Sequence, residues 1–587
     1  MIRELRRPLA RWRLIWTREG RLAFVRHLLG PLLAVGYRTW IARNEPAGAD
    51  LARQRVDARA MPYRPVFTVV IPAEDAPPAL LDASIRSAVD QSYDRWELRV
   101  AARPPRSAEV ERLAAAWVEK DARVHIDGAG ASPIPFGGAG EFVARLAAGD
   151  TLAPNALFEA ARLLNEHRGA EIIYFDEDAL SADGRTRSSP FFKPGWSPEM
   201  LLSVNYLAHA LIKRTLLEDI GLDVARAGPW DLALRCSERT REIRRIARVL
   251  YHSRAGAPPA PPGPEDLRAL EAHCRRQGIA GARAAVVPPG VVRLTWPAGD
   301  RHVSIIIPNK DREPFLRRCL TSLLRHTGYP RFEILIVDTG STDEAIRRYY
   351  ADLAHERRIR VLEHPGPFNF SAANNAGARG ATGDLLLFLN NDTEALNQDW
   401  LEEMVRWGDR PEIGAVGAKL LYPDGTIQHA GIVVGLRGLA HHIYRQAGET
   451  RVDLFGSVDW YRDYLAVTGA CLMMRRQVFD EVGGFDERYR IAYSDIEMCL
   501  RIHGRGYRIV YTPFARLRHD EGATRGGVYP PSDTRRALAH MGGLVASGDP
   551  YFHPGLSHES LLPALPRRGD RPRDVLFKRH LARTSAT

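Results

Sequence analysis

Cysteine is scarce in this chain, with five residues among 587. The cysteines are widely scattered and no two of them form a CxxC pair, so neither a disulfide framework nor a zinc site is expected. Cys319 falls on the apolar face of an expected helix, where we interpret it as a small core residue and not as a nucleophile. The full set is Cys236, Cys274, Cys319, Cys471 and Cys499.

Long apolar runs are also missing. The stretch from residue 22 to residue 37 is interrupted by Arg26, His27 and Pro31, which leaves it too short and too polar to span a membrane. No secretory cleavage pattern follows it. We therefore expect a cytoplasmic protein.

A signature of nucleic-acid binding is absent as well, although the formal charge is +11. Most of the excess lies in residues 1–43, where ten arginines stand against only Glu4 and Glu19. Because these arginines alternate with Trp, Leu, Ile and Phe, residues 1–60 are predicted to form a basic amphipathic arm. Such an arm either lies on the inner face of an anionic membrane as a peripheral contact or packs on the first domain, and both interpretations stay open. We expect no nucleic-acid partner.

The chain is long enough for two large domains, and its sequence contains an internal duplication. FTVVIP at residues 67–72 and VSIIIP at residues 303–308 each precede a helix and a second strand. A proline-rich run at residues 255–266 separates the two copies. We predict a first domain at 65–255, a linker with a short helix at 256–300, a second domain at 301–530 and a C-terminal tail at 531–587.

Alternating strands and helices indicate a parallel, doubly wound α/β sheet in each copy. In the second copy, apolar residues recur at helical spacing from residue 315 to residue 324, and the runs at 333–337 and 385–389 are typical of fully buried strands. Ligands of such folds bind at the carboxyl ends of the strands. The residues that follow 337 and 389 are therefore the first candidates for chemistry.

Polar residues follow both of these strands. Asp338-Thr339-Gly340-Ser341 comes after the first, and Asn390-Asn391-Asp392 comes after the second. An asparagine- and glycine-rich segment, FNFSAANNAGARGATGD, lies between them. Carboxylates and amides in this arrangement indicate a nucleotide-diphosphate site with a divalent cation, which prefers oxygen ligands and bridges phosphates.

Six segments in order carry a resemblance to a known family. They are PFNFSAANNAGARGATGDLLLFLNNDTE, AKLLYPDGTIQHAG, TGACLMMRR, GGFDERY, SDIEMCLR and RLRHDEGATRG. Together they resemble the family 2 glycosyltransferases of the GT-A fold, and more narrowly the tandem members of bacterial surface-polysaccharide and O-antigen assembly. The resemblance implies two tandem GT-A-like domains of Rossmann-like α/β class with mostly parallel sheets, the first of them degenerate.

The resemblance also implies roles for individual residues. Its catalytic base falls on Asp495, and its metal site falls on Asp392 and His519, with Asn390 in place of the first acid of a DxD motif. Taken singly, Asp495 is equally typical of a helix N-terminal acid and His519 of a structural hydrogen-bonder. The implied donor-binding residues are Pro308, Asn309, Asp311, Asp338, Ser341, Asn374, Asn375, Asn390 and Asn391. The implied acceptor side is Gly469, Ala470, Gly484 and Phe485.

The implied reaction is an inverting transfer from a UDP- or dTDP-sugar to a glycan or lipid-linked glycan acceptor, with Mn²⁺ or Mg²⁺ as cofactor. Inversion follows from one base and one displacement. Processive relatives carry a QxxRW motif after the base and membrane helices, and this chain has neither Gln nor Trp after Asp495. We therefore expect a non-processive enzyme. A noncatalytic glycan-binding or assembly scaffold is the alternative, and the role of His429 stays open.

The first copy lacks the residues that the family uses. Its DxD position falls on Ala147, Ala148 and Gly149, and its base position falls on Pro229. A cation has no oxygen ligand there. We expect the remaining acids of this copy, in YFDEDAL at residues 174–180, to be structural.

Overall fold

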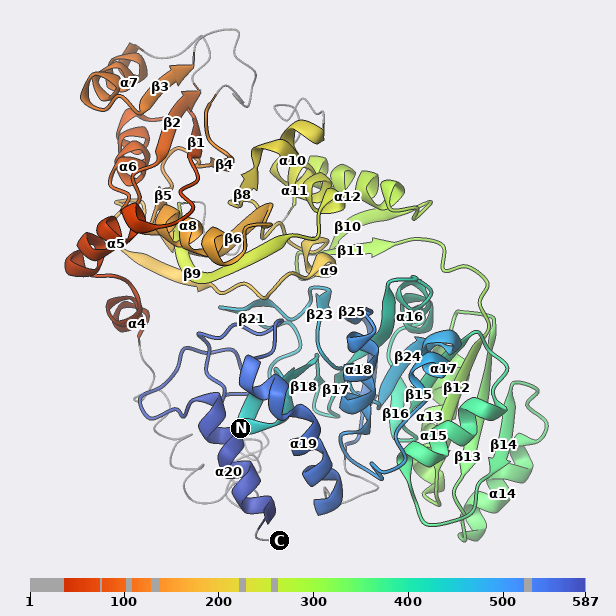
Figure 1. The fold of residues 1–587 in the computed structure, drawn as a ribbon. Helices are drawn as coiled ribbons and strands as arrows, with labels where there is room; N and C mark the ends of the chain where they lie inside the picture. The colour runs from red at the N-terminus through yellow and green to blue at the C-terminus, as the bar shows by residue number, and fades with distance from the viewer. Residues whose placement is uncertain are drawn as a thin grey trace, which may run out of the picture.

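The computed structural model describes residues 36–73, 76–101, 108–127, 138–220, 228–254, 262–521 and 530–585. The first part of the predicted arm, residues 1–35, lies outside the described residues. The described residues form two lobes (Figure 1). One lobe contains the first half of the chain, and the other contains the second half.

The first lobe is an α/β domain preceded by two short helices. Its elements are α4 (Tyr37–Asn44), α5 (Gly48–Ala60), β1 (Phe67–Pro72), α6 (Pro78–Val89), β2 (Trp96–Ala101), α7 (Ala108–Lys120), β3 (Val124–Asp127), β4 (Phe142–Arg145), β5 (Thr151–Leu152), α8 (Ala156–Glu166), β6 (Ile172–Leu180), β7 (Arg187–Phe191), α9 (Pro198–Leu201), β8 (Leu211–Lys213), α10 (Arg214–Asp219), α11 (Pro229–Arg239) and β9 (Ile243–Ser253). A helix and a hairpin then lead to the second lobe: α12 (Pro264–Arg276), β10 (Arg283–Val287) and β11 (Val291–Thr295).

The second lobe repeats this succession with longer insertions. Its elements are β12 (Val303–Asn309), α13 (Glu313–His326), β13 (Phe332–Asp338), α14 (Glu344–Leu353), β14 (Ile359–Glu363), α15 (Phe370–Gly380), β15 (Leu385–Leu389), β16 (Thr393–Ala395), α16 (Trp400–Gly408), β17 (Ile413–Leu421), β18 (Ile427–His429), β19 (Ile432–Val434), η1 (Leu436–Gly438), β20 (Ala440–His442), β21 (Val452–Asp453), β22 (Gly456–Ser457), β23 (Arg462–Asp463), β24 (Cys471–Arg475), α17 (Arg476–Val482), α18 (Ser494–Gly504), β25 (Arg508–His519), α19 (Pro531–Ser547) and α20 (Arg573–Ser585).

The two sheets have the same topology. The first runs β3-β2-β1-β4-β8-β6-β9-β5 and the second β14-β13-β12-β15-β24-β17-β25-β16. Each begins with four parallel strands, and the fifth strand of each, β8 or β24, pairs antiparallel with its neighbours. This correspondence at every position confirms the predicted tandem α/β fold and the internal duplication.

The core of the second domain follows from its sequence pattern. All seven residues of β12 and all five of β15 are buried, as expected for central strands covered on both faces. The helix α13 buries Leu316, Cys319, Leu320 and Leu323, which share one face. Burial raises the pKa of the Cys319 thiol to about 12, in keeping with its interpretation as a core residue.

The C-terminal segment completes the second domain. Leu538, Met541 and Val545 of α19 are buried in one apolar cluster with β19 and α18. Phe552 and Leu556, which follow α19, belong to the same cluster. The segment predicted as a tail therefore contributes to the core up to residue 556.

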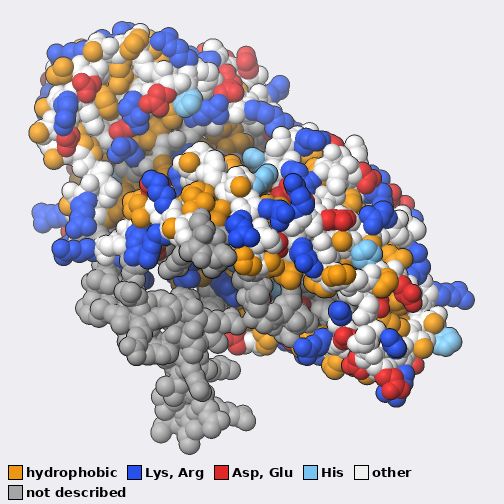
Figure 2. Space-filling model, turned by 60° about the horizontal axis from the view of Figure 1, so that its bottom comes forward, with side chains coloured by type: hydrophobic (Ala, Val, Ile, Leu, Met, Phe, Trp, Pro, Cys, Tyr) orange, Lys and Arg blue, Asp and Glu red, His pale blue; other side chains and the backbone are white. Residues whose placement is uncertain are grey.

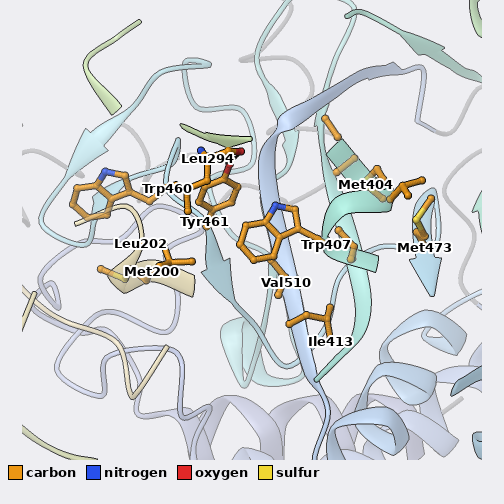
Figure 3. Packing of buried hydrophobic residues seen from close by; sticks show 14 of the residues in the cluster. Met200, Leu202, Leu294, Met404, Trp407, Ile413, Trp460, Tyr461, Met473 and Val510 are labelled. Carbon is orange, nitrogen blue, oxygen red and sulfur yellow. Dashed lines mark hydrogen bonds between the residues drawn. The ribbon is translucent and has the colours of Figure 1, made fainter. Parts of the chain in front are cut away.

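The two domains share a continuous apolar interface. Met200 and Leu202 of the first domain belong to the same cluster as Tyr461 and Trp407 of the second (Figure 3). The rings of Trp407 and Tyr461 have centroids 4.8 Å apart. Each such buried side chain contributes roughly 1.5–3 kcal/mol. The first domain is thus packed against the second through a buried apolar interface.

Buried polar contacts cross the same interface. Arg508 on β25 forms an ion pair of 2.8 Å with Glu199 on α9, and the Ser197 hydroxyl donates to Asp463 over 2.5 Å. In the C-terminal segment that follows α19, His553 Nε2 lies 2.7 Å from the Asp176 carboxylate of β6. Both side chains are almost completely buried. The C-terminal segment therefore connects the two domains.

We expect His553→Ala to destabilise the protein, because it leaves the Asp176 carboxylate buried without its partner. Removing one member of a buried pair typically lowers the free energy of unfolding by about 3–5 kcal/mol. Thermal and denaturant unfolding measure the effect, with His540→Ala on exposed helix surface as the matched control. Equal stability of the two variants would contradict the structural role of the pair.

Candidate active site

The carboxyl ends of β12 and β13 form a polar pocket. Asp338 accepts hydrogen bonds from the Ser341 hydroxyl and from the Tyr350 hydroxyl, the latter over 3.1 Å. The Asn309 amide donates to the same Tyr350 oxygen over 2.8 Å. Asp311 accepts the backbone N–H groups of Asp343 and Thr342, which hold the pKa of its carboxyl below the ordinary value. The pocket therefore presents fixed acceptors and amide groups.

A second group of side chains lies at the ends of β15 and β25 in the same sheet. The antiparallel pairing of β16 with β25 places Thr393 opposite His519, so that Asp392 Oδ1 comes within 3.2 Å of His519 Nε2. The Asn390 amide lies 3.3 Å from the same nitrogen. Asn391 donates to Asn309 over 2.6 Å and thereby joins this group to the polar pocket.

Gln428 on β18 orients the His519 ring. His519 Nδ1 lies 3.3 Å from the Gln428 side-chain oxygen, which can only accept. Nδ1 then carries the proton, and Nε2 faces the Asp392 carboxylate and the Asn390 amide. This is the usual arrangement for a histidine whose second nitrogen binds a metal. The tautomer is assigned from the hydrogen-bond partners.

The side chains of Asp392, His519 and Asn390 are the candidate ligands of one divalent cation. Among the described residues no group of three or more His, Cys, Asp or Glu side chains is placed to hold a metal. Asp392 and His519 supply one carboxylate and one imidazole, and the Asn390 amide offers an oxygen. Diphosphate oxygens are ligands that such a cation accepts readily, so the incomplete protein set suits a metal that binds together with a nucleotide.

Asp495 lies near this edge at the start of α18. Its Oδ2 accepts the backbone N–H of Gly469 over 2.8 Å, and its side chain is partly exposed. Ala470, the next residue along the chain, accepts the backbone N–H of Asn390 over 3.1 Å. A Cβ at Gly469 would come 3.3 Å from the Asp495 Cβ, so this close approach favours glycine. The structure thus brings Asp495 next to the Asn390–Asp392 turn.

Other predicted site residues have structural contacts. The Asn375 amide donates to the carbonyl of Phe485 and its oxygen accepts the N–H of the same residue, both over 2.9 Å. Asn374 is completely buried and donates to Phe370. Gly484 has φ +71° and lies against Asn375, while Phe485 packs on Phe370. A direct role of these four in substrate binding stays a prediction.

The corresponding place in the first domain is filled by internal contacts. The pairing of β5 with β9 sets Thr151 opposite His252, as Thr393 is set opposite His519. This register corrects the assignment of the position to Ala147, Ala148 and Gly149 by one residue, because Asp150 precedes Thr151 as Asp392 precedes Thr393. An acid, Asp150, is therefore present here. Its Oδ2 accepts the Tyr251 hydroxyl over 2.7 Å and its Oδ1 accepts the Arg254 backbone N–H over 2.8 Å. Both oxygens are therefore already occupied.

The base position of the first domain can be located from a shared ion pair. In α18, Arg501 pairs with Glu497 over 2.7 Å at a spacing of four residues. In α11, Arg235 pairs with Asp231 over 2.9 Å at the same spacing. Aligning the two sequences on these pairs sets Pro229 opposite Asp495, in agreement with the sequence-based assignment. A proline has no side-chain acid or base.

The acids of β6 are paired with cations. Asp178 lies 2.7 Å from His252 Nδ1 and 2.7 Å from the Arg187 guanidinium. Glu177 lies 3.0 Å from the buried Lys193 ammonium. Such contacts are those of structural residues, as the sequence predicted for this strand.

Sequence reasoning missed a residue of the site, Gln428, which touches His519. His442 on β20 lies within 3.2 Å of His429, whose role the sequence left open. The segment TIQHAG was among the motifs that carry the resemblance, so the signal for Gln428 was present in the sequence. His442 stands in HHIYRQAG, a segment that resembles no motif we recognised.

Comparison with known proteins identifies the family of part of the second domain. A family model described as "Glycosyl transferase family 2" matches residues 304–483. The matched region contains the pocket of Asp338 and the Asn390–Asp392 turn. This region of the second domain belongs to glycosyl transferase family 2. Asp495 and His519 lie beyond the matched residues.

Curated relatives cover both domains. The chain is 40% identical over 551 residues to "O-antigen biosynthesis protein RfbC" of Myxococcus xanthus, covering 89% of this chain and 42% of that protein. It is 36% identical over 534 residues to "Uncharacterized protein y4gI" of Sinorhizobium fredii, covering 85% of this chain and 58% of that protein. The chain thus spans about half the length of these two proteins.

Shorter relatives and solved structures match parts of the chain. An "N-acetylglucosaminyl-diphospho-decaprenol L-rhamnosyltransferase" of Mycobacterium tuberculosis is 28% identical over 246 residues, covering 36% of this chain and 74% of that protein. The mannosyltransferase PcManGT of Pyrobaculum calidifontis, solved with GDP-Man and Mn²⁺, has a TM-score of 0.33 at 19% identity and covers 54% of this chain and 83% of that chain.

The comparison of the two domains predicts a single cation-dependent nucleotide site. We expect calorimetric titration with Mn²⁺ and UDP or dTDP to show one site per chain. Asp392→Ala should abolish it, because the Asn390–Asp392 turn then has no anionic oxygen for the cation. Asp150→Asn in the first domain is the matched control and should bind as wild type does. Two sites, or sensitivity to Asp150→Asn, would show that the first domain also binds.

Proposed function

We propose that the second domain transfers a sugar from a nucleotide-diphosphate sugar to a glycan acceptor in bacterial surface-polysaccharide assembly. The observation that carries this proposal is the meeting of three groups at one sheet edge: the polar pocket of Asp338, the facing pair Asp392 and His519, and Asp495. A nucleotide base, a diphosphate with its cation and an acceptor hydroxyl need these three kinds of group. We further propose that transfer is inverting and non-processive.

Asp495 acts as the general base in this proposal. The Gly469 N–H donates to its carboxylate and fixes it at the N-terminus of α18. The carboxylate can then take the proton of an acceptor hydroxyl as that oxygen attacks the anomeric carbon. Because one base acts in this proposal and the displacement occurs once, the configuration of the anomeric carbon inverts.

The donor is held by the other two groups. Asp338 and Asn309 supply acceptors and amide groups for a uracil or thymine base and its ribose. Asp392 and His519 would hold Mn²⁺ or Mg²⁺, which when bound stabilises the negative charge of the departing diphosphate as a Lewis acid. The M. tuberculosis relative is named for transfer to a lipid diphosphate-linked sugar, which supports a lipid-linked acceptor here.

The first domain serves as a folded scaffold in this proposal and not as a second catalyst. Pro229 stands at its base position, and both oxygens of Asp150 are hydrogen-bonded internally. A wholly noncatalytic scaffold is the alternative for the entire chain. Cation-dependent hydrolysis of the nucleotide sugar without acceptor separates the two, because a scaffold hydrolyses none.

We expect Asp495→Asn to lower sugar transfer by about a hundred- to ten-thousand-fold, since a positioned base contributes that much. Asparagine keeps an oxygen for the Gly469 N–H, so nucleotide binding should stay near the wild-type value. Transfer is measured with a panel of UDP- and dTDP-sugars, and Asp480→Asn on the exposed side of α17 is the control. Wild-type turnover in Asp495→Asn would remove this residue from the mechanism.

A peripheral membrane contact through the N-terminal arm is a separate proposal, which rests on its sequence alone. Among the described residues no helix is long and apolar enough to cross a membrane. Lys and Arg side chains elsewhere are scattered over both lobes without one dominant basic face in the view shown (Figure 2). The arginines of residues 1–35 are therefore the best candidates for contact with anionic lipid.

We expect deletion of residues 1–35 to weaken binding to vesicles that contain anionic lipid, while donor hydrolysis is retained. Each arginine near such a surface contributes about 1 kcal/mol, and salt screens the effect. The deletion stops at residue 35 because Trp40 packs on Phe192 at a centroid distance of 5.3 Å. Co-sedimentation at two salt concentrations measures the loss, and unchanged sedimentation would rule out the arm as a membrane anchor.

A further inference from the structure

The hydroxyl of Tyr350 on α14 links two side chains of the polar pocket. The Asn309 amide nitrogen donates to the Tyr350 oxygen over 2.8 Å, and the same nitrogen donates to the Asp311 carbonyl over 3.2 Å. Because a carbonyl oxygen can only accept, the Asp311 contact fixes the orientation of the Asn309 amide. The Tyr350 oxygen therefore accepts from Asn309 and has its own proton left to donate.

The proton of Tyr350 goes to the Asp338 carboxylate. Asp338 Oδ1 lies 3.1 Å from the Tyr350 oxygen. An ionised carboxylate only accepts hydrogen bonds, so the direction of this bond is settled. On the other side of the chain of contacts, the Asn309 oxygen accepts the Asn391 amide over 2.6 Å. The Tyr350 hydroxyl is thus held between the turn that follows β15 and the carboxylate that follows β13.

A second hydroxyl donates to the same oxygen of Asp338. Ser341 Oγ accepts the backbone N–H of Asp311 over 2.8 Å, and its own proton goes to Asp338 Oδ1. An ionised carboxylate offers about two lone-pair sites on each oxygen. The hydroxyls of Ser341 and Tyr350 therefore occupy both sites of Oδ1.

Oδ2 is the open oxygen of Asp338. Among the described residues its hydrogen-bond donor is the Ser341 backbone N–H, which lies 3.2 Å from each of the two carboxylate oxygens and is shared between them. At least one lone-pair site of Oδ2 thus stays available, and the residue is partly exposed. Asp338 therefore presents one acceptor oxygen to a ligand, whereas an unconstrained carboxylate would present two.

A single acceptor oxygen discriminates between nucleotide bases. Uracil and thymine carry one imide N–H between two carbonyl oxygens, and a single acceptor satisfies it. Guanine presents a ring N–H and an amino group side by side, which together match the two oxygens of one carboxylate. Against Asp338 one of these two donors would stay unpaired, and a donor that is desolvated without a partner is costly.

We propose that Tyr350 is a specificity-determining residue that occupies Asp338 Oδ1 and thereby makes the nucleotide site select uracil or thymine over guanine. Tyr350 acts on the base through Asp338 and is therefore a positioning residue. This inference rests on the proposed function, in which Asp338 faces the base of the donor, and it adds the side chain that sets the choice of base.

Tyr350→Phe tests the proposal because it removes the hydroxyl and keeps the ring. One site of Asp338 Oδ1 is then open, so guanine can use both carboxylate oxygens, while the uracil contact loses a fixed carboxylate. We expect the ratio of the Kd for GDP to the Kd for UDP to fall about tenfold, the effect of one hydrogen bond. Calorimetric titration of the full chain with each diphosphate and Mn²⁺ measures both constants.

Tyr349→Phe is the matched control. Tyr349 precedes Tyr350 on α14, and its hydroxyl forms no hydrogen bond with a described residue. Its ring centroid lies 4.0 Å from the Arg317 guanidinium carbon, a contact that phenylalanine keeps. We expect both Kd values of this variant to equal those of the wild type. Thermal unfolding of the two variants checks the fold, since a destabilised pocket would weaken GDP and UDP alike.

The possible results separate this inference from the proposed function. An unchanged GDP-to-UDP ratio in Tyr350→Phe, an equal loss of both affinities, or a wild-type protein that prefers GDP would overturn the role of Tyr350 and leave sugar transfer itself untouched. A wild type that binds no nucleoside diphosphate with Mn²⁺ and transfers no sugar would overturn the proposed function, and the role of Tyr350 with it.

Discussion

The candidate site depends on the antiparallel register between β16 and β25. That register sets Thr393 opposite His519 and so brings Asp392 and His519 together, although they are far apart in sequence. A shift by one residue would turn His519 to the other face of the sheet, because side chains alternate along a strand. Strand β25 is held in place by its long parallel pairing with β17 and by the Arg508–Glu199 ion pair with the first domain. The first domain therefore helps to support the strand that carries His519.

The duplication shows how the same register has different consequences in the two halves. In the first domain the pairing of β5 with β9 still presents an acid and a histidine at the sheet edge. The Tyr251 hydroxyl donates to the Asp150 carboxylate and so occupies one of its oxygens. The His252 ring forms a hydrogen bond with Asp178. What separates the two domains is thus not the backbone but the hydrogen-bond partners of these polar atoms, since the acid and the histidine are buried to the same extent in both domains.

Much of this architecture could be predicted from local patterns. The strands expected at residues 333–337 and 385–389 are β13 and β15, and the polar residues that follow them meet because parallel strands end at one edge. The contacts of Gln428 and His442 could not be predicted, since β18 and β20 are three-residue strands whose return to the site depends on tertiary packing. For Asn375 the sequence motif predicted a ligand contact. In the structure its side-chain amide instead forms two hydrogen bonds with the backbone of Phe485.

The acids of β6 show how buried carboxylates are accommodated in the first domain. Asp176, Glu177 and Asp178 are buried, and a buried carboxylate without a partner costs several kcal/mol. Each one has a cationic or imidazole partner: His553, Lys193 and His252, respectively. His553 comes from the C-terminal segment of the second domain, so the Asp176 carboxylate has its partner across the domain interface. The buried acids of β6 thus help to hold the two domains together.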